Sequence, residues 1–334
     1  MLRTPQNREC IMKAIRITKT GGPEVLEVQE IELPPPGRGE VRVKHTVIGV
    51  NFIDTYHRSG LYPAPLLATL GGEAAGVVEA VGEGVSGLKP GDRVGYCTVA
   101  FCAYAEAANI PAERLVKLPD GITDEVAAAA MLKGMTAQYL LKRTFAVRPG
   151  QTILFHAAAG GVGLIACQWA RHLGATVIGT VGSDEKVALA NANGCAHVLN
   201  TRKDDWVARV REITGGEGVP VVYDSIGKDT WDGSLDCLAV RGLMASFGNA
   251  SGAVPSFSPG ILSAKGSLYL TRPSLYHYTR TPAELQETAD DLFDVISKGI
   301  VKIAVNQRFK LTDARAAHEA LHSRQTTGAT VLIP

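Results

Sequence analysis

The sequence predicts an α/β protein that combines a partly open β-barrel with a doubly wound parallel sheet, and two patterns along the chain support this. From Met12 to about residue 120, short alternating runs are separated by glycine and proline turns, as in a small barrel. From Thr152 onward, strand patterns alternate with helix patterns, which is typical of a parallel sheet with right-handed crossovers. A length of 334 residues favours two domains over one core.

The composition is that of a globular protein without a strongly charged surface. Hydrophobic residues make up 46% and charged residues 20%, and the formal net charge is +1. Bulk electrostatic attraction to nucleic acid or to an anionic membrane is therefore not expected. No apolar run approaches the length of about 20 residues that a membrane helix needs. We expect neither nucleic acid nor a membrane as a partner.

Cysteine usage and the N-terminus indicate a cytoplasmic protein. The six cysteines form no CxxC pair and no Cys/His cluster, which favours reduced, metal-free thiols. Residues 1–11 include Arg3, Arg8 and Glu9 and lack the apolar core of a signal peptide. Met12 resembles a natural start, so we predict that residues 1–11 form a poorly packed N-terminal extension.

The first part of the chain is predicted to consist mainly of strands. Residues 12–33 should form two short strands around a Gly-Gly-Pro turn, and Glu40–Val50 a longer strand with one buried face. Further strands should begin near Gly71 and after the turn at Pro90. The segment 51–56 mixes polar and aromatic residues, and two interpretations stay open. It is either a half-buried turn with packed tyrosine rings or the wall of a pocket.

Helical patterns begin near Thr123, with helices predicted over residues 124–131 and 136–143. The strands predicted next are 152–155, 175–181, 197–200, 219–224, 243–247 and 267–270. The helices predicted between them are 164–172, 186–192, 206–213 and 230–238. Two last helices, 282–298 and 313–323, precede a strand at 330–333 that should return to the first domain. Thr281 and Glu284 should cap the first of these two helices.

The turn between the strand 152–155 and its helix carries a dinucleotide-type fingerprint. Ala158, Gly160 and Gly163 occupy its three small positions. Gly160 would let backbone approach a pyrophosphate, Gly163 would let the helix pack close to the strand, and the helix N-terminus would attract the phosphates. Ala158 stands where glycine is usual, so an ordinary small-residue turn is the alternative. The six predicted strands favour dinucleotide binding.

Several motifs resemble one enzyme family over nearly the whole chain from residue 12 to 334. They are Asn-Phe-Ile-Asp-Thr-Tyr (51–56), Gly-Gly-Glu-Ala-Ala-Gly (71–76), Phe-His-Ala-Ala-Ala-Gly-Gly-Val-Gly (155–163), Val-Tyr-Asp-Ser (222–225), Phe-Gly-Asn-Ala-Ser-Gly (247–252) and Thr-Arg-Pro-Ser-Leu (271–275). These motifs look like those of the zinc-free, ζ-crystallin-like NADPH:quinone oxidoreductases, a branch of the medium-chain dehydrogenase/reductase superfamily. The similarity is greatest to the bacterial members.

The resemblance implies a domain organisation and an assembly. A GroES-like catalytic domain would comprise residues 12–134 and 275–334, and a Rossmann NADPH-binding domain residues 135–274, with the cofactor in the cleft between them. Two chains would form a homodimer by pairing the edge strand 267–270. An exposed edge strand favours such a partner.

The family comparison also argues against a metal. Zinc-dependent relatives carry Cys and His ligands where this chain has Asn51 and Asp54, and a His where Gly72 precedes Glu73. Two further cysteines, at 97 and 102, cannot make a tetrahedral site alone. We expect no metal, and we expect Glu73 to be structural, accepting hydrogen bonds from backbone.

The end of the second strand of the sheet favours NADPH over NADH. In an NAD site an acidic residue there accepts the ribose hydroxyls. Here Gly182 and Ser183 leave room for a 2′-phosphate, Lys186 can neutralise it, and Asp184 lies one step into the loop. The alternative is that Lys186 is an ordinary solvated helix residue.

Two further residues bear on this end of the cofactor. By resemblance Arg324 faces the adenosine phosphate, although it too could be merely solvated. The family commonly has Tyr where this chain has Thr201, so we expect weaker binding rather than a switch to NAD.

The remaining cofactor contacts are implied by resemblance alone. The nicotinamide end would be lined by Asn51, Phe52, Tyr56, Lys133, Thr136 and Tyr139, with Asp54 in the same cofactor-binding set. The backbone at Gly160, Gly161 and Val162 would contact the pyrophosphate, and Asn249, Ser251 and Gly252 would contact the cofactor after the fifth strand.

The function implied is NADPH-dependent reduction of quinones to semiquinones or hydroquinones without a metal. Hydride transfer needs the nicotinamide carbon about 3–3.5 Å from the acceptor atom. Asn51 and Tyr56 are the candidates for positioning and hydrogen bonding, with solvent as an alternative proton source. Two other functions stay open: reduction of an enone, alkenal or enoyl thioester, and a non-enzymatic RNA-binding or crystallin-like role. No basic stripe with interleaved aromatics supports RNA binding.

Overall fold

The structure is a computed structural model that describes residues 10–98, 101–323 and 326–334. It divides into two compact units. The barrel unit comprises the described residues up to Leu132 together with Thr279–Phe293 and Ile303–Pro334. The sheet unit comprises Lys133–Tyr278 and Asp294–Lys302. The division falls within the helices α2 (Asp124–Tyr139) and α9 (Pro282–Ser297).

The barrel unit is built from short strands, as predicted. They are β1 (Cys10–Ile17), β2 (Glu27–Leu33), β3 (Glu40–Val50), β4 (Ala68–Thr69), β5 (Glu73–Val81), β6 (Arg93–Cys97), β7 (Ala107–Pro111), β8 (Leu115–Lys117), β15 (Val305–Lys310) and β16 (Ala329–Ile333). One sheet has the order β2-β1-β4, and a seven-stranded sheet has the order β15-β16-β3-β5-β6-β8 with β7 also paired to β3. The closing strand β16 pairs antiparallel with β3, as expected.

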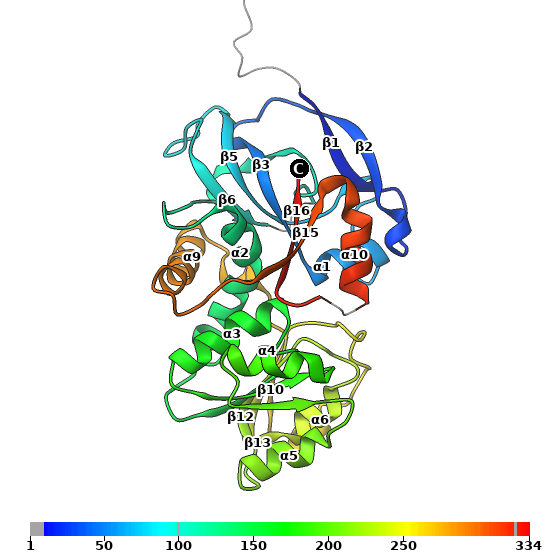
Figure 1. The fold of residues 1–334 in the computed structure, drawn as a ribbon, viewed down its shortest axis with the longest axis vertical. Helices are drawn as coiled ribbons and strands as arrows, with labels where there is room; N and C mark the ends of the chain where they lie inside the picture. The colour runs from blue at the N-terminus through cyan, green and yellow to red at the C-terminus, as the bar shows by residue number, and fades with distance from the viewer. Residues whose placement is uncertain (1–9, 99–100, 324–325) are drawn as a thin grey trace, which may run out of the picture. The chain divides into compact units, whose positions relative to one another are not determined.

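Helices complete the barrel unit and fix its C-terminal part. They are α1 (Phe52–Ser59) and α10 (Ala314–His322), with the single turns η2 (Pro23–Val25), η3 (Ala112–Arg114) and η6 (Leu311–Asp313). In Figure 1, α10 lies beside α1, and contacts between the two helices agree. The cap predicted for α9 is present, because Thr281 N–H donates to Glu284 Oε2 at 3.1 Å and Glu284 N–H to Thr281 Oγ1 at 3.2 Å.

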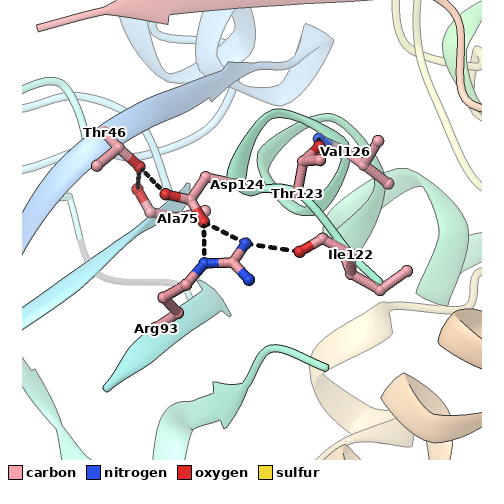
Figure 2. A network of polar contacts seen from close by, with 7 residues as sticks. All are labelled: Thr46, Ala75, Arg93, Ile122, Thr123, Asp124 and Val126. Atoms are coloured by element: carbon pink, nitrogen blue, oxygen red, sulfur yellow. Dashed lines mark hydrogen bonds and ion pairs between the residues drawn. The ribbon is translucent and has the colours of Figure 1, made fainter. Parts of the chain in front are cut away.

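The start of α2 is fastened to the strands of the barrel unit by a polar cluster. Figure 2 shows Asp124, the first residue of the helix, between Thr46 and Arg93. The Thr46 hydroxyl donates to Asp124 Oδ2 at 2.7 Å, and Arg93 Nη2 donates to Asp124 Oδ1 at 2.6 Å. The same guanidinium also donates to the Ile122 carbonyl at 2.6 Å. The first turn of α2 is therefore held in position by side chains from two strands, β3 and β6.

The sheet unit holds a doubly wound parallel sheet, which confirms the predicted fold class. Its strands are β9 (Thr152–Phe155), β10 (Thr176–Val181), β11 (His197–Asn200), β12 (Val219–Asp224), β13 (Leu238–Ser246) and β14 (Tyr269–Thr271). They lie in the order β11-β10-β9-β12-β13-β14, and every pairing is parallel. The order is that of the dinucleotide-binding sheet, with the reversal between β9 and β12.

Helices cover both faces of this sheet. They are the π-helical turn η4 (Leu140–Thr144), α3 (Gly161–His172), η5 (Asp184–Lys186), α4 (Val187–Ala192), α5 (Trp206–Ile213), α6 (Trp231–Asp236), α7 (Gly260–Ala264) and α8 (Leu275–Tyr278). Figure 1 shows α3 and α4 on one face and α5 and α6 on the other. Among the helices of the described residues, none combines the length and the apolar character that crossing a bilayer would need.

Several local predictions were wrong for identifiable reasons. The segment after β3 is the helix α1 rather than a turn, since Asp54 accepts from Asn51 N–H at 2.8 Å and Gly60 ends the helix at φ +82°. Helix α2 is continuous where two helices were predicted. Strand β14 begins at Tyr269, two residues late, because Ser267 has a positive φ of 55°. Strand β3 has one buried face, as predicted, but on its other face only Lys44 and Thr46 are exposed.

The predicted extension 1–11 overlaps the fold at its end. Strand β1 begins at Cys10, two residues before the start predicted at Met12. Cys10 pairs with Leu33 of β2. Residues 1–9 of the predicted extension lie outside the described residues. Strand β15 was not predicted, since it has a polar sequence and depends on its partner β16 for its hydrogen bonds.

Candidate active site

The turn between β9 and α3 is packed so closely that glycine is required at its last small position. A Cβ on Gly163 would lie 2.3 Å from the Ala157 carbonyl oxygen and 2.7 Å from Ala158 Cα. At Gly160, the residue before the helix, a Cβ would lie 3.1 Å from the same carbonyl. Ala157 itself has a positive φ of 52°. The helix N-terminus is thus pressed against the strand, as the fingerprint predicts.

The alanine in the usual glycine position is accommodated by a glycine on the neighbouring strand. A Cβ on Gly179 of β10 would lie 2.7 Å from the Ala158 Cβ and 2.5 Å from Cys195 Sγ. Ala158 is fully buried, and its N–H donates to the Thr180 carbonyl at 2.9 Å. The glycine that the motif lacks at position 158 is therefore present on the neighbouring strand, at position 179.

A buried polar network ties together the carboxyl ends of three strands beneath this turn. Ser234 and Thr230 hydroxyls donate to Asp224 Oδ2 at 2.8 and 2.7 Å. His156 Nε2 lies 2.9 Å from Ser234 Oγ and His156 Nδ1 lies 2.8 Å from Thr180 Oγ1. Since the Ser234 proton goes to Asp224, His156 carries its proton on Nε2 and accepts at Nδ1. Burial lowers the pKa of His156, so the ring is neutral here.

None of the predicted site residues belongs to this network. Its signal is nonetheless in the sequence, because His156, Thr180 and Asp224 are polar residues at the carboxyl ends of buried apolar strands. At that edge of a parallel sheet, polar groups converge. The network fixes where the phosphate turn begins.

The adenosine-end residues lie in the loop after β10. Gly182 has open space where a Cβ would point, and Ser183 precedes the short helix η5 that contains Lys186. Thr201, just after β11, donates its N–H to the Val181 carbonyl at 3.0 Å and its hydroxyl to the same oxygen at 3.3 Å. The structure therefore brings Gly182, Ser183 and Thr201 to one edge of the sheet. The predicted phosphate contact Arg324 lies outside the described residues.

One set of predicted cofactor-binding residues lies on the part of α2 that belongs to the sheet unit. Lys133, Thr136 and Tyr139 follow one another at spacings of three on α2 and are buried. The Tyr139 ring stacks on Tyr278 at 4.5 Å, and burial raises the pKa of its phenol. These three residues share one face of the helix.

The loop after β13 is tied to the loop after β12. Ser251 Oγ donates to the Ile226 carbonyl at 2.9 Å and accepts from Asp229 N–H at 3.0 Å. Gly252 has a positive φ of 116° and donates its N–H to the Asn249 carbonyl at 2.9 Å. The three residues predicted here, Asn249, Ser251 and Gly252, therefore form one ordered turn.

In the barrel unit, Asn51 is oriented by a buried carboxylate. Its side-chain Nδ2 donates to Glu73 Oε2 at 2.7 Å, and the other oxygen of Glu73 accepts from Leu132 N–H at 2.6 Å. Glu73 is fully buried, and a Cβ on Gly49 would lie 2.2 Å from its Oε2. As predicted, Glu73 accepts a hydrogen bond from backbone, and it also holds the Asn51 amide in one orientation.

A second buried array fixes the first turn of α1, and we name it the Asp54 array: Asp54, Tyr104, His318 and Arg58. Tyr104 OH donates to Asp54 Oδ2 at 2.9 Å and lies 3.0 Å from His318 Nε2. His318 Nδ1 lies 3.0 Å from Arg58 Nη1. Because Arg58 can only donate, His318 carries its proton on Nε2. Burial and then the charge of Arg58 lower the pKa of His318 to about 3.

Tyr104, His318 and Arg58 are not among the predicted site residues. Tyr104 lies 50 residues from Asp54 and 214 residues from His318, so no spacing rule connects them. All four residues of the Asp54 array are buried. The array joins α10 to α1, which carries the predicted residues Phe52, Asp54 and Tyr56.

The exposed side of α1 carries an aromatic cluster. Tyr56 packs between Phe52, at 6.4 Å, and Tyr62, at 5.1 Å, and His57 packs its edge against Phe101 at 4.7 Å. All five rings are half-buried. The segment 51–56 was expected to be either a half-buried turn with packed tyrosine rings or the wall of a pocket. The rings do pack against one another, but on a helix.

The site in the described residues offers no group of three or more His, Cys, Asp and Glu side chains that could hold a metal ion. At the position where ligands would be needed, Asn51 and Glu73 hydrogen-bond each other instead. What the two units provide is a phosphate-type turn in the sheet unit and an oriented amide in the barrel unit.

Comparison with known proteins agrees with both units. Residues 37–141 match the family described as alcohol dehydrogenase GroES-like domain, and residues 161–298 match the family described as zinc-binding dehydrogenase. Together with the fold, these matches define a two-domain dehydrogenase of the medium-chain type.

Full-length relatives narrow the class. The chain is 56% identical to a quinone oxidoreductase of Pseudomonas aeruginosa, over 96% of this chain and 99% of that protein. A solved structure of Escherichia coli quinone oxidoreductase complexed with NADPH has a TM-score of 0.95 at 53% identity, covering 96% of this chain and 100% of that one. A 2-haloacrylate reductase from a Burkholderia species is 49% identical over 97% of this chain and 99% of that protein. The chain belongs to the quinone oxidoreductase family.

Proposed function

We propose that this chain is an NADPH-dependent quinone oxidoreductase. The observation that carries the cofactor assignment is the turn at Gly160–Gly163, where the close packing at Gly163 sets the N-terminus of α3 against the end of β9, as in a pyrophosphate-binding turn. The quinone as acceptor is supported by the relatives named above, at 53% and 56% identity over nearly their whole length. When bound, NADPH supplies the hydride that the acceptor receives.

The residues present fit this cofactor. Backbone N–H groups at Gly161 and Val162, in the first turn of α3, would bind the pyrophosphate. Ser183 and Lys186 would bind the 2′-phosphate beside the open space at Gly182, together with Arg324. Lys133, Thr136 and Tyr139 and the turn Asn249, Ser251 and Gly252 would complete the set.

Residues of the barrel unit would orient the acceptor. One N–H of the Asn51 amide is committed to Glu73, which fixes the direction of the rest of the amide. Tyr56 is half-buried and held between two rings, so its position is fixed as well. We infer that Asn51 and Tyr56 position the acceptor and hydrogen-bond the oxygen on which charge develops.

The test is a steady-state comparison with NADPH as donor and 1,4-benzoquinone or 9,10-phenanthrenequinone as acceptor. Turnover well above the rate without enzyme is expected for at least one of the two quinones. Asn51→Leu should lower kcat/KM by about tenfold to 100-fold, since it removes the oriented amide. Rates no better than the blank for both quinones would overturn the proposal.

A second candidate is reduction of an activated carbon–carbon double bond. The relative named 2-haloacrylate reductase, at 49% identity over the full chain, favours it. With NADPH and 2-chloroacrylate or an alkenal as acceptor, this function predicts loss of the alkene together with oxidation of NADPH. A higher kcat/KM for the alkene than for either quinone would make it the primary activity.

We also propose a homodimer formed through the free edge of β14. This strand ends the six-stranded sheet, and Tyr269 on it and Val240 on the neighbouring strand are 62% and 74% exposed. Edge strands with exposed apolar side chains favour pairing with a second copy. Light scattering should give a dimer for the wild type and a monomer for Tyr269→Lys. Ile11→Lys, which changes an exposed side chain in the barrel unit, should leave the dimer intact.

Zinc independence and a cytoplasmic location belong to the same proposal. The hydrogen bond between Asn51 and Glu73 supports the first, because it occupies the groups at the usual ligand position. The second is supported by Cys167 and Cys195, which hydrogen-bond each other as free thiols and thus suit a reducing compartment. Dialysis against a zinc chelator should leave quinone turnover unchanged.

A further inference from the structure

The loops after β10 and β11 hold the carboxylate of Asp184 between two donors. Asn200 Nδ2 donates to Asp184 Oδ1 at 2.6 Å, and Lys203 Nζ forms an ion pair with Asp184 Oδ2. Both oxygens of the carboxylate therefore have a partner from the next strand along the sheet. The side chains of Asp184 and Lys203 are themselves exposed, at 58% and 65%.

The partner loop is held in place by Asn200. This residue ends β11 and is buried. Its N–H donates to Asp204 Oδ2 at 2.6 Å, and its Oδ1 accepts from Arg202 N–H at 3.1 Å. Because its side-chain Nδ2 also donates to Asp184, Asn200 fixes the loop that carries Lys203 through two N–H donors and one oxygen acceptor. The backbone of the loop that carries Lys203 is thus held by hydrogen bonds, although both side chains of the ion pair are exposed.

The position of Asp184 gives this pair a consequence for cofactor choice. Asp184 lies in the loop three residues beyond Val181, the last residue of β10, next to the position where an acidic residue in a dinucleotide site accepts the ribose hydroxyls and disfavours a 2′-phosphate. Hydrogen bonds from Lys203 and then Asn200 lower the pKa of Asp184, so the carboxyl stays ionised. An ionised carboxylate at this position would repel a 2′-phosphate unless its charge is cancelled.

We propose that Lys203 determines cofactor specificity by cancelling the charge of Asp184, which keeps the adenosine end of the site selective for NADPH over NADH. The inference rests on the proposed cofactor site and deepens it. With Lys203 removed, Asp184 is released to repel the 2′-phosphate and to accept ribose hydroxyls. With Asp184 neutralised, Lys203 becomes superfluous for selectivity.

The experiment measures selectivity within each variant, as the ratio of kcat/KM for NADPH to that for NADH with one quinone. Lys203→Met should lower this ratio about tenfold, because a bare carboxylate then faces the phosphate. Asp184→Asn should not lower it. The double variant Asp184→Asn with Lys203→Met should have the ratio of Asp184→Asn. Because both cofactors are measured on the same protein, a loss of stability does not move the ratio.

Two matched controls isolate the charge. Lys203→Arg keeps the cation and should keep the wild-type ratio. Lys298→Met removes the lysine of another exposed pair in the sheet unit, with Asp294 at 2.8 Å, and should also leave the ratio unchanged. A ratio within twofold of wild type for Lys203→Met would overturn the inference. So would a double variant that stays as low as Lys203→Met, since Lys203 would then act on the phosphate directly.

Binding measurements separate this inference from the proposed reaction. Dissociation constants for NADPH and NADH, from quenching of protein fluorescence without any quinone, should show the same shift in Lys203→Met. If the wild type reduces no quinone yet shows the shift in binding, the proposed reaction fails and the inference holds. If quinone is reduced and binding selectivity is unaffected by Lys203→Met, the reaction stands and the inference fails.

Discussion

The two parts of the candidate site are built by opposite means. In the sheet unit, the turn at Gly160–Gly163 is shaped by the absence of side chains, because a Cβ on Gly163 would meet backbone at 2.3 Å. In the barrel unit, Asn51 and the first turn of α1 are held by buried side chains, through Glu73 and the Asp54 array. The first part is rigid because it is close-packed backbone, and the second because its buried polar groups are satisfied.

This difference predicts different responses to mutation. A clash with backbone cannot be relieved by a rotamer change, so the turn should fail abruptly. A hydrogen-bond array loses one bond at a time and leaves a buried group unsatisfied, at about 1–3 kcal/mol for each. Substitutions in the turn should therefore abolish NADPH binding. Each substitution in the Asp54 array should instead cause only a partial loss.

The largest effect is expected for Gly163→Val. The added side chain would overlap the Ala157 carbonyl and displace the N-terminus of α3 from the strand. A displacement of this kind should weaken NADPH binding by about 100-fold or more, as measured by fluorescence titration. Gly260→Ala is the control, since its Cβ would meet only Ser258 Oγ at 3.6 Å. Near-normal binding by Gly163→Val would contradict close packing as the basis of the turn.

The Asp54 array can be tested against a second tyrosine–histidine pair in the same unit. Tyr96 OH lies 2.8 Å from His45 Nε2, and Tyr96, like Tyr104, is fully buried. Tyr104→Phe and Tyr96→Phe should each lower the free energy of unfolding by about 1–3 kcal/mol in urea denaturation. Only Tyr104→Phe removes a donor from Asp54, so only this variant should lower kcat/KM, by about tenfold. Equal kinetic effects would reduce the array to a purely structural role.

The buried histidines predict a pH dependence of stability. Burial lowers the pKa of His45 from 6.5 to about 4, and burial with the Arg58 charge lowers that of His318 from 6.5 to about 3. The unfolded chain therefore binds more protons below pH 6.5. The stabilisation is complete above this pH and is lost as the pH falls towards the folded-state values.

Between pH 7.5 and 5.5 each histidine should reduce the free energy of unfolding by about 1.4 kcal/mol. His318→Gln keeps a donor towards Tyr104 and should remove one such contribution from the pH dependence. Urea denaturation at the two pH values measures it. An unchanged difference between the two pH values in the variant would mean that His318 is protonated in the folded protein.

The fold could be predicted from the sequence where the pattern is local. Four of the six strands of the sheet unit match their predicted ranges to within one residue, since buried parallel strands are short apolar runs bounded by turn residues. Helix α1 has only eight residues, too few for a reliable period, and its cap depends on Asp54. Strand β15 alternates in burial, but its polar residues conceal the pattern until β16 is known.

The candidate site also has one part that could be predicted from the sequence and one part that could not. The phosphate turn could be predicted because its three small residues lie within six positions of one another. The Asp54 array could not, because its bonds join residues 50, 214 and 260 positions apart. Lys203 and Asp184 lie only 19 positions apart, yet their contact depends on two strands being adjacent in the sheet. Contacts set by sheet order become visible only with the fold.

The smallest effect concerns Thr201, where the resemblance to the family led us to expect tyrosine. Thr201 is half-buried and bonds only to the end of β10 among its described contacts, through the Val181 carbonyl. Thr201→Tyr should restore an aromatic contact worth about 0.5–1.5 kcal/mol and tighten dinucleotide binding roughly threefold to tenfold. NADPH and NADH should gain equally, because the ring meets the part they share. Thr201→Ser, which keeps the hydroxyl, should not tighten either. A gain confined to NADPH would instead assign position 201 to the 2′-phosphate, and the selectivity attributed to Lys203 would then be shared between two residues of the loop after β11.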